Sequence, residues 1–128
     1  MKILAVSDTH GDREILTALL KQQPHLDGYF YAGDSELAAD DGLFQQYEAV
    51  EGNMDYDPNF PMQITTTIQG VTVFMAHGHR FGVNFGLDKL IAAGEGVHAD
   101  LIIFGHTHQL GVAVSYTHLR AHETLMNL

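Results

Sequence analysis

The sequence has 128 residues, which suits a single domain with a core of its own. Six basic residues against sixteen acidic ones give a formal charge of −10, which excludes the basic surface of a sequence-specific nucleic-acid binder. Cysteine is absent, so disulfides and thiolate sites are excluded, and the apolar runs are too short to span a membrane. The apolar run after Lys2 is also too short for a signal peptide, so we expect a cytoplasmic protein.

The first half of the chain alternates short apolar runs with segments of helical periodicity. The strands expected here cover residues 2–7, 28–32 and 47–50. The helices expected here cover residues 12–22, with Asp12 as the N-cap, and residues 36–46.

The second half begins with a hairpin signal, because Gln69-Gly70 separates the β-branched runs 63–68 and 71–76. The later elements expected are a helix over residues 87–97 and strands over residues 101–104 and 111–114. Strands that alternate with helices, together with one hairpin, indicate an α/β fold with a mixed sheet.

Five of the expected strands are followed by a turn that contains glycine together with Asp, Asn or His. The turns are Ser7-Asp8-Thr9-His10-Gly11, Gly33-Asp34, Gly52-Asn53-Met54-Asp55, His77-Gly78-His79 and Gly105-His106-Thr107-His108. Ligands of open α/β sheets bind outside the carboxyl ends of the strands. We therefore expect these turns to converge on one pocket.

These turns supply carboxylate, imidazole and amide-oxygen donors. The candidate metal ligands are Asp8, His10, Asp34, Asn53, His77, His106 and His108. Such a mixed set suits Mn²⁺, Fe²⁺ or Zn²⁺, and it is too large for one tetrahedral site but matches two ions that share a ligand. Each motif alone is also typical of an ordinary turn or helix cap, so the prediction depends on their joint occurrence.

The order of these motifs resembles the calcineurin-like metallophosphoesterase superfamily, and the small size is most similar to its YfcE-type bacterial phosphodiesterases. The resemblance covers residues 1–114. It implies a four-layer αββα sandwich with a dinuclear metal site at the strand ends. It also implies hydrolysis of a phosphodiester by a hydroxide on the metal centre, with diester preference over monoester inferred from this subgroup alone.

The resemblance further implies how the ligands divide between two divalent ions. Asp8, His10, Asp34 and His108 would hold one ion, and Asp34, Asn53, His77 and His106 would hold the other, with Asp34 as the bridge. Asn53 would also face the substrate phosphate. Manganese is the expected metal, with Fe, Zn or Ni as alternatives.

Larger members of the superfamily carry a histidine, taken as the general acid, at the position of Met54. His79 is our candidate for that role, because it lies two residues from a ligand and the unperturbed pKa of a histidine suits an acid. The alternative is that His79 supports His77. Asp55 either orients a neighbouring histidine or caps the loop. Without a good acid, the enzyme should favour substrates with acidic leaving groups.

The end of the sequence also departs from the superfamily. Residues 115–128 resemble a translated sequencing-adapter read-through, so we expect residues 1–114 to form a C-terminally truncated domain and residues 115–128 to be a non-native tail. The last strands of the second sheet would then be missing, which would leave a sheet edge exposed.

The competing interpretation is a catalytically silent metal-binding scaffold, or a protein-interaction module of the same fold, as in a retromer subunit related to this superfamily. The filled ligand set favours an enzyme, because a scaffold has no need to keep seven polar ligands in a costly buried cluster. The expected partner is a small phosphoester substrate, with no sequence-specific nucleic acid and no membrane, and homo-oligomerisation is left open.

Overall fold

The computed structural model describes residues 2–82, 86, 88–105, 111–114 and 124–125. The helical elements are Arg13–Gln22 (α1), Asp88–Gly96 (α2) and the short 3₁₀ turns Gly42–Gln45 (η1) and His79–Phe81 (η2). The strands are Ile3–Val6 (β1), Gly28–Tyr31 (β2), Glu48–Ala49 (β3), Gln63–Ile68 (β4), Val71–Ala76 (β5), Leu101–Phe104 (β6), Gly111–Val114 (β7) and Thr124–Leu125 (β8).

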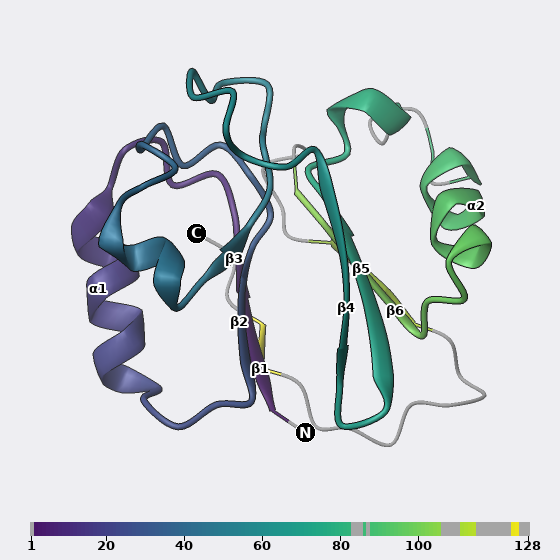
Figure 1. Ribbon diagram of the computed structural model, residues 1–128, viewed down its shortest axis with the longest axis horizontal. Helices are drawn as coiled ribbons and strands as arrows, with labels where there is room; N and C mark the ends of the chain where they lie inside the picture. The colour runs from purple at the N-terminus through teal and green to yellow at the C-terminus, as the bar shows by residue number, and fades with distance from the viewer. Residues whose placement is uncertain (1, 83–85, 87, 106–110, 115–123, 126–128) are drawn as a thin grey trace.

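These strands form two sheets, in the orders β3-β2-β1-β8 and β4-β5-β6-β7. Every pairing in the first sheet is parallel. In the second sheet β5 and β6 are parallel, whereas β4 and β7 run antiparallel to their neighbours. Figure 1 shows the two sheets face to face, with α1 outside the first sheet and α2 outside the second. The expected αββα layering is confirmed.

Three apolar clusters fill the spaces between these four layers. The cluster between the sheets includes Ile3 and Ala5 of β1 and Val73 and Met75 of β5. A second cluster packs the other face of β1 against α1, and a third packs β5 and β6 against α2. Because both faces of these strands are covered, their sequences are apolar apart from Thr72 near the start of β5, and most polar side chains follow where the strands end.

Most of the expected elements are present. The Asp12 side chain caps α1 by accepting the Ile15 N–H (3.2 Å). The β4–β5 hairpin turns at Gln69 (φ 50°) and Gly70 (φ 80°), the two positive angles of a type I′ turn. Within the described residues, no helix is long and apolar enough to cross a membrane.

The expected helix over residues 36–46 is wrong, since only the short turn η1 forms there. The physical reason is competition for backbone donors. The N–H groups of Glu36 and Ala39 donate to the side chains of Asp55 and Asp57, at 2.8 Å in both cases. Donors that are satisfied by distant carboxylates do not form helical bonds to carbonyls four residues earlier.

Strand β8 lies inside the segment expected to be a tail. Its two residues pair in parallel with β1, Thr124 opposite Leu4 and Leu125 opposite Ala5. The division of the chain at residue 114, and the expected loss of later strands, stay predictions.

Candidate metal centre

The loops after β1 and β2 lie side by side and continue the pairing of their strands. The Asp8 N–H donates to the Gly33 carbonyl (3.0 Å), and the His10 N–H donates to the Asp34 carbonyl (3.1 Å). The non-glycine residues of these loops with left-handed backbones are Asp8 (φ 60°), His10 (φ 49°), Asp34 (φ 63°) and Glu36 (φ 56°). This conformation costs about 1 kcal/mol or more per residue, so neighbouring groups have to hold both loops in place.

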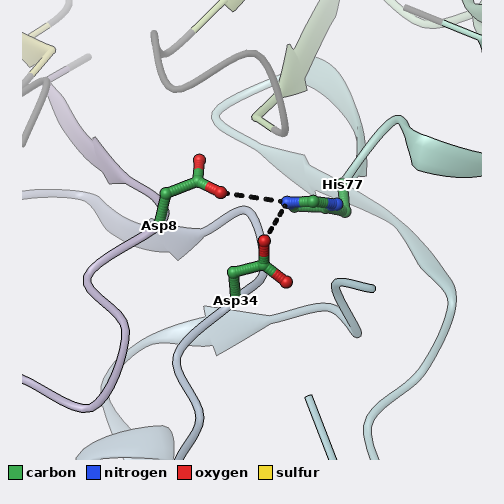
Figure 2. Close-up of side chains that lie close together, drawn as sticks. All are labelled: Asp8, Asp34 and His77. Atoms are coloured by element: carbon green, nitrogen blue, oxygen red, sulfur yellow. Dashed lines mark hydrogen bonds and ion pairs between the residues drawn. The ribbon is translucent and has the colours of Figure 1, made fainter. Parts of the chain in front are cut away.

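Three buried side chains meet where β1, β2 and β5 end (Figure 2). Nε2 of His77 lies 3.1 Å from Oδ1 of Asp8 and 3.1 Å from Oδ2 of Asp34. One potential ligand atom from each residue lies within 4.8 Å of the other two. Since Asp8 and Asp34 follow strands of the first sheet and His77 follows a strand of the second, both sheets build this cluster.

The two carboxylates decide the protonation of the imidazole between them. Burial alone would lower the pKa of His77, but hydrogen bonds to Asp34 and Asp8, and their charges, outweigh burial and raise this pKa to about 9. Burial alone would raise the pKa of Asp34, but hydrogen bonds from His77 and the Met54 N–H outweigh it and lower this pKa to about 2. At neutral pH the cluster therefore holds an imidazolium, and a metal ion bound at Nε2 would displace its proton.

One oxygen of this cluster fits the requirement for a metal ligand. Among the described residues, Oδ2 of Asp8 is buried and accepts no hydrogen bond, which is costly for a carboxylate oxygen unless a cation compensates. Glycines allow the close approach around the cluster. A Cβ atom at Gly105 would lie 2.9 Å from Oδ2 of Asp8, and one at Gly52 would lie 2.1 Å from Oδ1 of Asp34. The donor set of two carboxylates and one imidazole suits a divalent transition-metal ion.

The remaining predicted ligands differ in how the structure places them. His10 lies on the β1 loop, where its Nδ1 is 3.3 Å from Oε2 of Glu36, and it is not in the three-residue cluster. Asn53 is exposed and directly precedes Met54, whose N–H donates to Oδ1 of Asp34 (2.8 Å). His106 and His108 lie outside the described residues.

His79 contacts His77 on the side of the ring away from the carboxylates. The two Nδ1 atoms are 3.1 Å apart, and the ring centroids are 5.2 Å apart. The imidazole nitrogen of His77 that faces Asp8 and Asp34 is Nε2. His79 therefore holds the ring through its other nitrogen, which is how an outer group fixes the orientation and tautomer of a metal-binding histidine.

Tyr31 and Glu36 are residues of this site that the sequence reasoning missed. The Thr9 N–H donates to the Tyr31 hydroxyl (2.9 Å), which in turn donates to the Asp34 carbonyl (3.3 Å). Burial is the main cause that raises the pKa of Tyr31 above its ordinary value. Tyr31 gives no sequence signal, because it is part of an apolar strand. Glu36 could have been suspected only from its position two residues after Asp34.

The geometry agrees with the comparison of the chain with protein-family models. The model of the calcineurin-like phosphoesterase superfamily domain matches residues 1–125. The chain belongs to the calcineurin-like phosphoesterase superfamily. This confirms the resemblance inferred from the strand-end motifs, and membership in this superfamily supports a metal-dependent phosphoesterase.

Individual relatives agree with this membership. Probable metallophosphoesterase YsnB of Bacillus subtilis (strain 168) is 31% identical over 115 residues, which are 89% of this chain and 68% of that protein. The crystal structure of a conserved uncharacterized protein of Streptococcus pneumoniae TIGR4, described as a predicted phosphoesterase, matches with a TM-score of 0.79 at 33% identity. That match covers 83% of this chain, and the chain spans only 62% of the pneumococcal protein.

The same fold occurs in a more distant protein. Vacuolar Protein Sorting 29 of Cryptosporidium parvum matches with a TM-score of 0.68 at 18% identity, over 96% of this chain and 72% of that one. At this identity the likeness concerns the calcineurin-like phosphoesterase fold alone.

Proposed function

We propose that this chain hydrolyses phosphodiesters with the help of two divalent metal ions, of which manganese is the expected one and Fe, Zn or Ni are the alternatives. The observation that carries the proposal is the cluster of Asp8, Asp34 and His77, with a buried oxygen of Asp8 that accepts no hydrogen bond among the described residues. Divalent ions, when bound, act as Lewis acids toward phosphoryl oxygens and activate water for attack at phosphorus.

Asp8, Asp34 and His77 would hold metal directly, and Asp34 is proposed as the shared ligand. Its two oxygens differ in surroundings: Oδ2 faces His77, whereas Oδ1 accepts the Met54 N–H. His10, Asn53, His106 and His108 complete the proposed ligand set from the superfamily pattern. Asn53 is also proposed to contact the substrate phosphate, in keeping with its exposed position next to Asp34's partner Met54.

For His79 the contact with His77 favours orientation of the metal-binding ring over proton donation. If no side chain protonates the leaving group, the rate depends steeply on leaving-group acidity. A series of aryl phosphodiesters with different phenol pKa values measures this dependence. A steep decrease of rate with rising phenol pKa supports the orienting role, and a flat dependence restores His79 as a candidate acid.

The decisive test is the hydrolysis of bis-p-nitrophenyl phosphate by the metal-free protein after addition of Mn²⁺, Fe²⁺, Zn²⁺ or Ni²⁺. We expect turnover only with metal, and faster turnover of this diester than of p-nitrophenyl phosphate. Asp34→Asn keeps the shape of the side chain but removes its charge, and should abolish turnover. Asp40→Asn, at an exposed position on the same connection, is the matched control and should retain it.

A second candidate function is a protein-interaction scaffold, favoured by the likeness of this fold to Vacuolar Protein Sorting 29. Metal binding without turnover of diester or monoester would favour this candidate. The small phosphoester substrate, the cytoplasmic location and the absence of sequence-specific nucleic-acid binding stay parts of the proposal, in keeping with the acidic, cysteine-free composition.

A further inference from the structure

Asp55 connects the two loops that carry Asp34 and Asn53. Its side chain accepts four hydrogen bonds, two at each carboxylate oxygen. Oδ2 accepts the N–H groups of Asp34 (2.9 Å) and Gly52 (2.7 Å). Oδ1 accepts the N–H of Glu36 (2.8 Å) and the hydroxyl of Ser35 (3.3 Å). One carboxylate thus takes donors from the loop after β2 and from its own loop after β3.

Two of the donors to Asp55 are backbone N–H groups of residues in a strained conformation, which other groups have to hold in place. Asp34 and Glu36 are the non-glycine residues of the β2 loop with left-handed backbones, and both donate their N–H to Asp55. Asp34 is the proposed shared metal ligand, and Glu36 faces the proposed ligand His10. The strained backbone of a ligand and that of its neighbour are therefore held by the same side chain.

The loop after β1 is linked to Asp55 indirectly, through its hydrogen bonds to the β2 loop. Asp8, His10 and Gly11 donate their N–H groups to the carbonyls of Gly33, Asp34 and Ser35. Wherever the β2 loop is placed, the backbone that carries Asp8 and His10 follows it. Asp55 thereby acts on ligands that it does not touch.

From these contacts we infer that Asp55 is a positioning residue of the metal centre, which sets the geometry of Asp34 directly and that of Asp8 and His10 through the β2 loop. The inference rests on the proposed function, because it concerns the metal site on which that function depends. It assigns to Asp55 neither contact with metal nor contact with substrate.

The substitution that tests this inference is Asp55→Asn. An asparagine side chain has one acceptor oxygen, so an NH₂ group faces two of the four donors in either orientation. The matched control is Asp57→Asn. Asp57 lies in the same loop and also accepts backbone N–H groups, those of Ala39 (2.8 Å) and Asn59 (2.9 Å). Within the part of the chain that the structure describes, its hydrogen bonds go to no residue of the proposed site.

The measurements are Mn²⁺ affinity of the full chain by titration calorimetry, the visible spectrum of the Co²⁺-loaded protein, and unfolding of the metal-free protein. We expect Asp55→Asn to bind Mn²⁺ about 10- to 100-fold more weakly and to alter the Co²⁺ spectrum. Asp57→Asn should lower stability to a similar extent and bind Mn²⁺ within about twofold of wild type. Equal affinities for the two variants would overturn the inference.

Should Asp55→Asn fail to fold, Ser35→Ala takes its place, because it removes one of the four donors to Asp55. A loss of Mn²⁺ affinity of roughly twofold or more supports the inference, and an unchanged affinity overturns it. Wild-type protein that binds Mn²⁺ without turnover refutes the proposed hydrolysis but leaves this comparison of affinities intact. Wild-type protein that binds no Mn²⁺ overturns both.

Discussion

Two loops deliver candidate ligands to the same cluster, and they make their sharp turns in different ways. In the loop after β5, His77 is followed by Gly78 (φ 105°), and the short turn η2 ends at Gly82 (φ 63°), so glycine takes the left-handed positions. In the loop after β2, Gly33 (φ 102°) also takes a left-handed position, but so do two residues with side chains, Asp34 (φ 63°) and Glu36 (φ 56°). A glycine at position 34 would provide no side chain to bind an ion. The left-handed backbone of Asp34 is therefore held by hydrogen bonds with the side chains of Asp55 and Tyr31. A ligand can occupy a strained position only where other groups hold it there.

The comparison predicts that the largest loss of stability comes from a side chain added where the loop after β3 contacts Asp34 in the loop after β2. In Gly52→Ala the new Cβ atom would lie 2.1 Å from Oδ1 and 2.4 Å from the backbone nitrogen of Asp34. We expect the free energy of unfolding to fall by about 3 kcal/mol, as for severe overpacking, measured by urea denaturation without metal. Gly42→Ala, where a Cβ atom meets nothing within 4 Å, is the control. A Gly52→Ala variant as stable as that control would show that the two loops are not in contact.

In the loop after β5, a substitution of glycine should lower stability through backbone strain and not through crowding. Gly78→Ala places a side chain at φ 105°, and we expect a loss of about 1–2 kcal/mol in the free energy of unfolding. Gly96→Ala, at the end of α2 with nothing within 4 Å of the new Cβ atom, should be neutral or slightly stabilising. If both alanines gave the same stability, the left-handed turn at Gly78 would be wrong.

The smallest effect on stability is expected from the exposed ion pair between Arg13 of α1 and Asp41, which lies between β2 and β3. The Arg13 guanidinium donates to Asp41 (3.0 Å) and, together with the Leu43 N–H, holds the pKa of Asp41 below its ordinary value. A lowered pKa stabilises the fold above the ordinary Asp pKa, and this contribution is lost as pH falls through the folded value. Arg13→Gln should therefore lower the melting temperature slightly at pH 7 and by less near pH 3, below the ordinary Asp pKa. Thermal unfolding at both pH values checks this, and an equal decrease at both would contradict it.

The sequence predicts well whatever depends on local patterns. Apolar runs that are covered on both faces predict the strands, Asp12 predicts the start of α1, and Gln69-Gly70 predicts the hairpin register. Asp8, Asp34 and His77 could be expected to meet because each follows a strand. The family, inferred from the order of these motifs, is confirmed by the family model, and the layering that this resemblance implies is confirmed by the structure.

Contacts between distant segments could not be predicted from such patterns. The expected helix over residues 36–46 fails because Asp55 and Asp57, some 20 residues later, accept its backbone donors. The role of the Tyr31 hydroxyl could not be predicted either, because the residue belongs to an apolar strand. Only the fold brings this hydroxyl to Thr9 and the Asp34 carbonyl. For Asp55 the sequence left two roles open, and the geometry shows that it caps the loops.

The origin of the cluster in both sheets has a thermodynamic consequence. Asp8 and Asp34 extend from one sheet and His77 from the other, so anything that binds all three also fastens the two halves of the molecule together. In the metal-free chain the imidazole of His77, with Nε2 3.1 Å from both carboxylates, makes this connection. An ion bound to all three would couple the association of the sheets to the free ion concentration. Each tenfold rise above the dissociation constant would add about 1.4 kcal/mol to the stability of the whole fold.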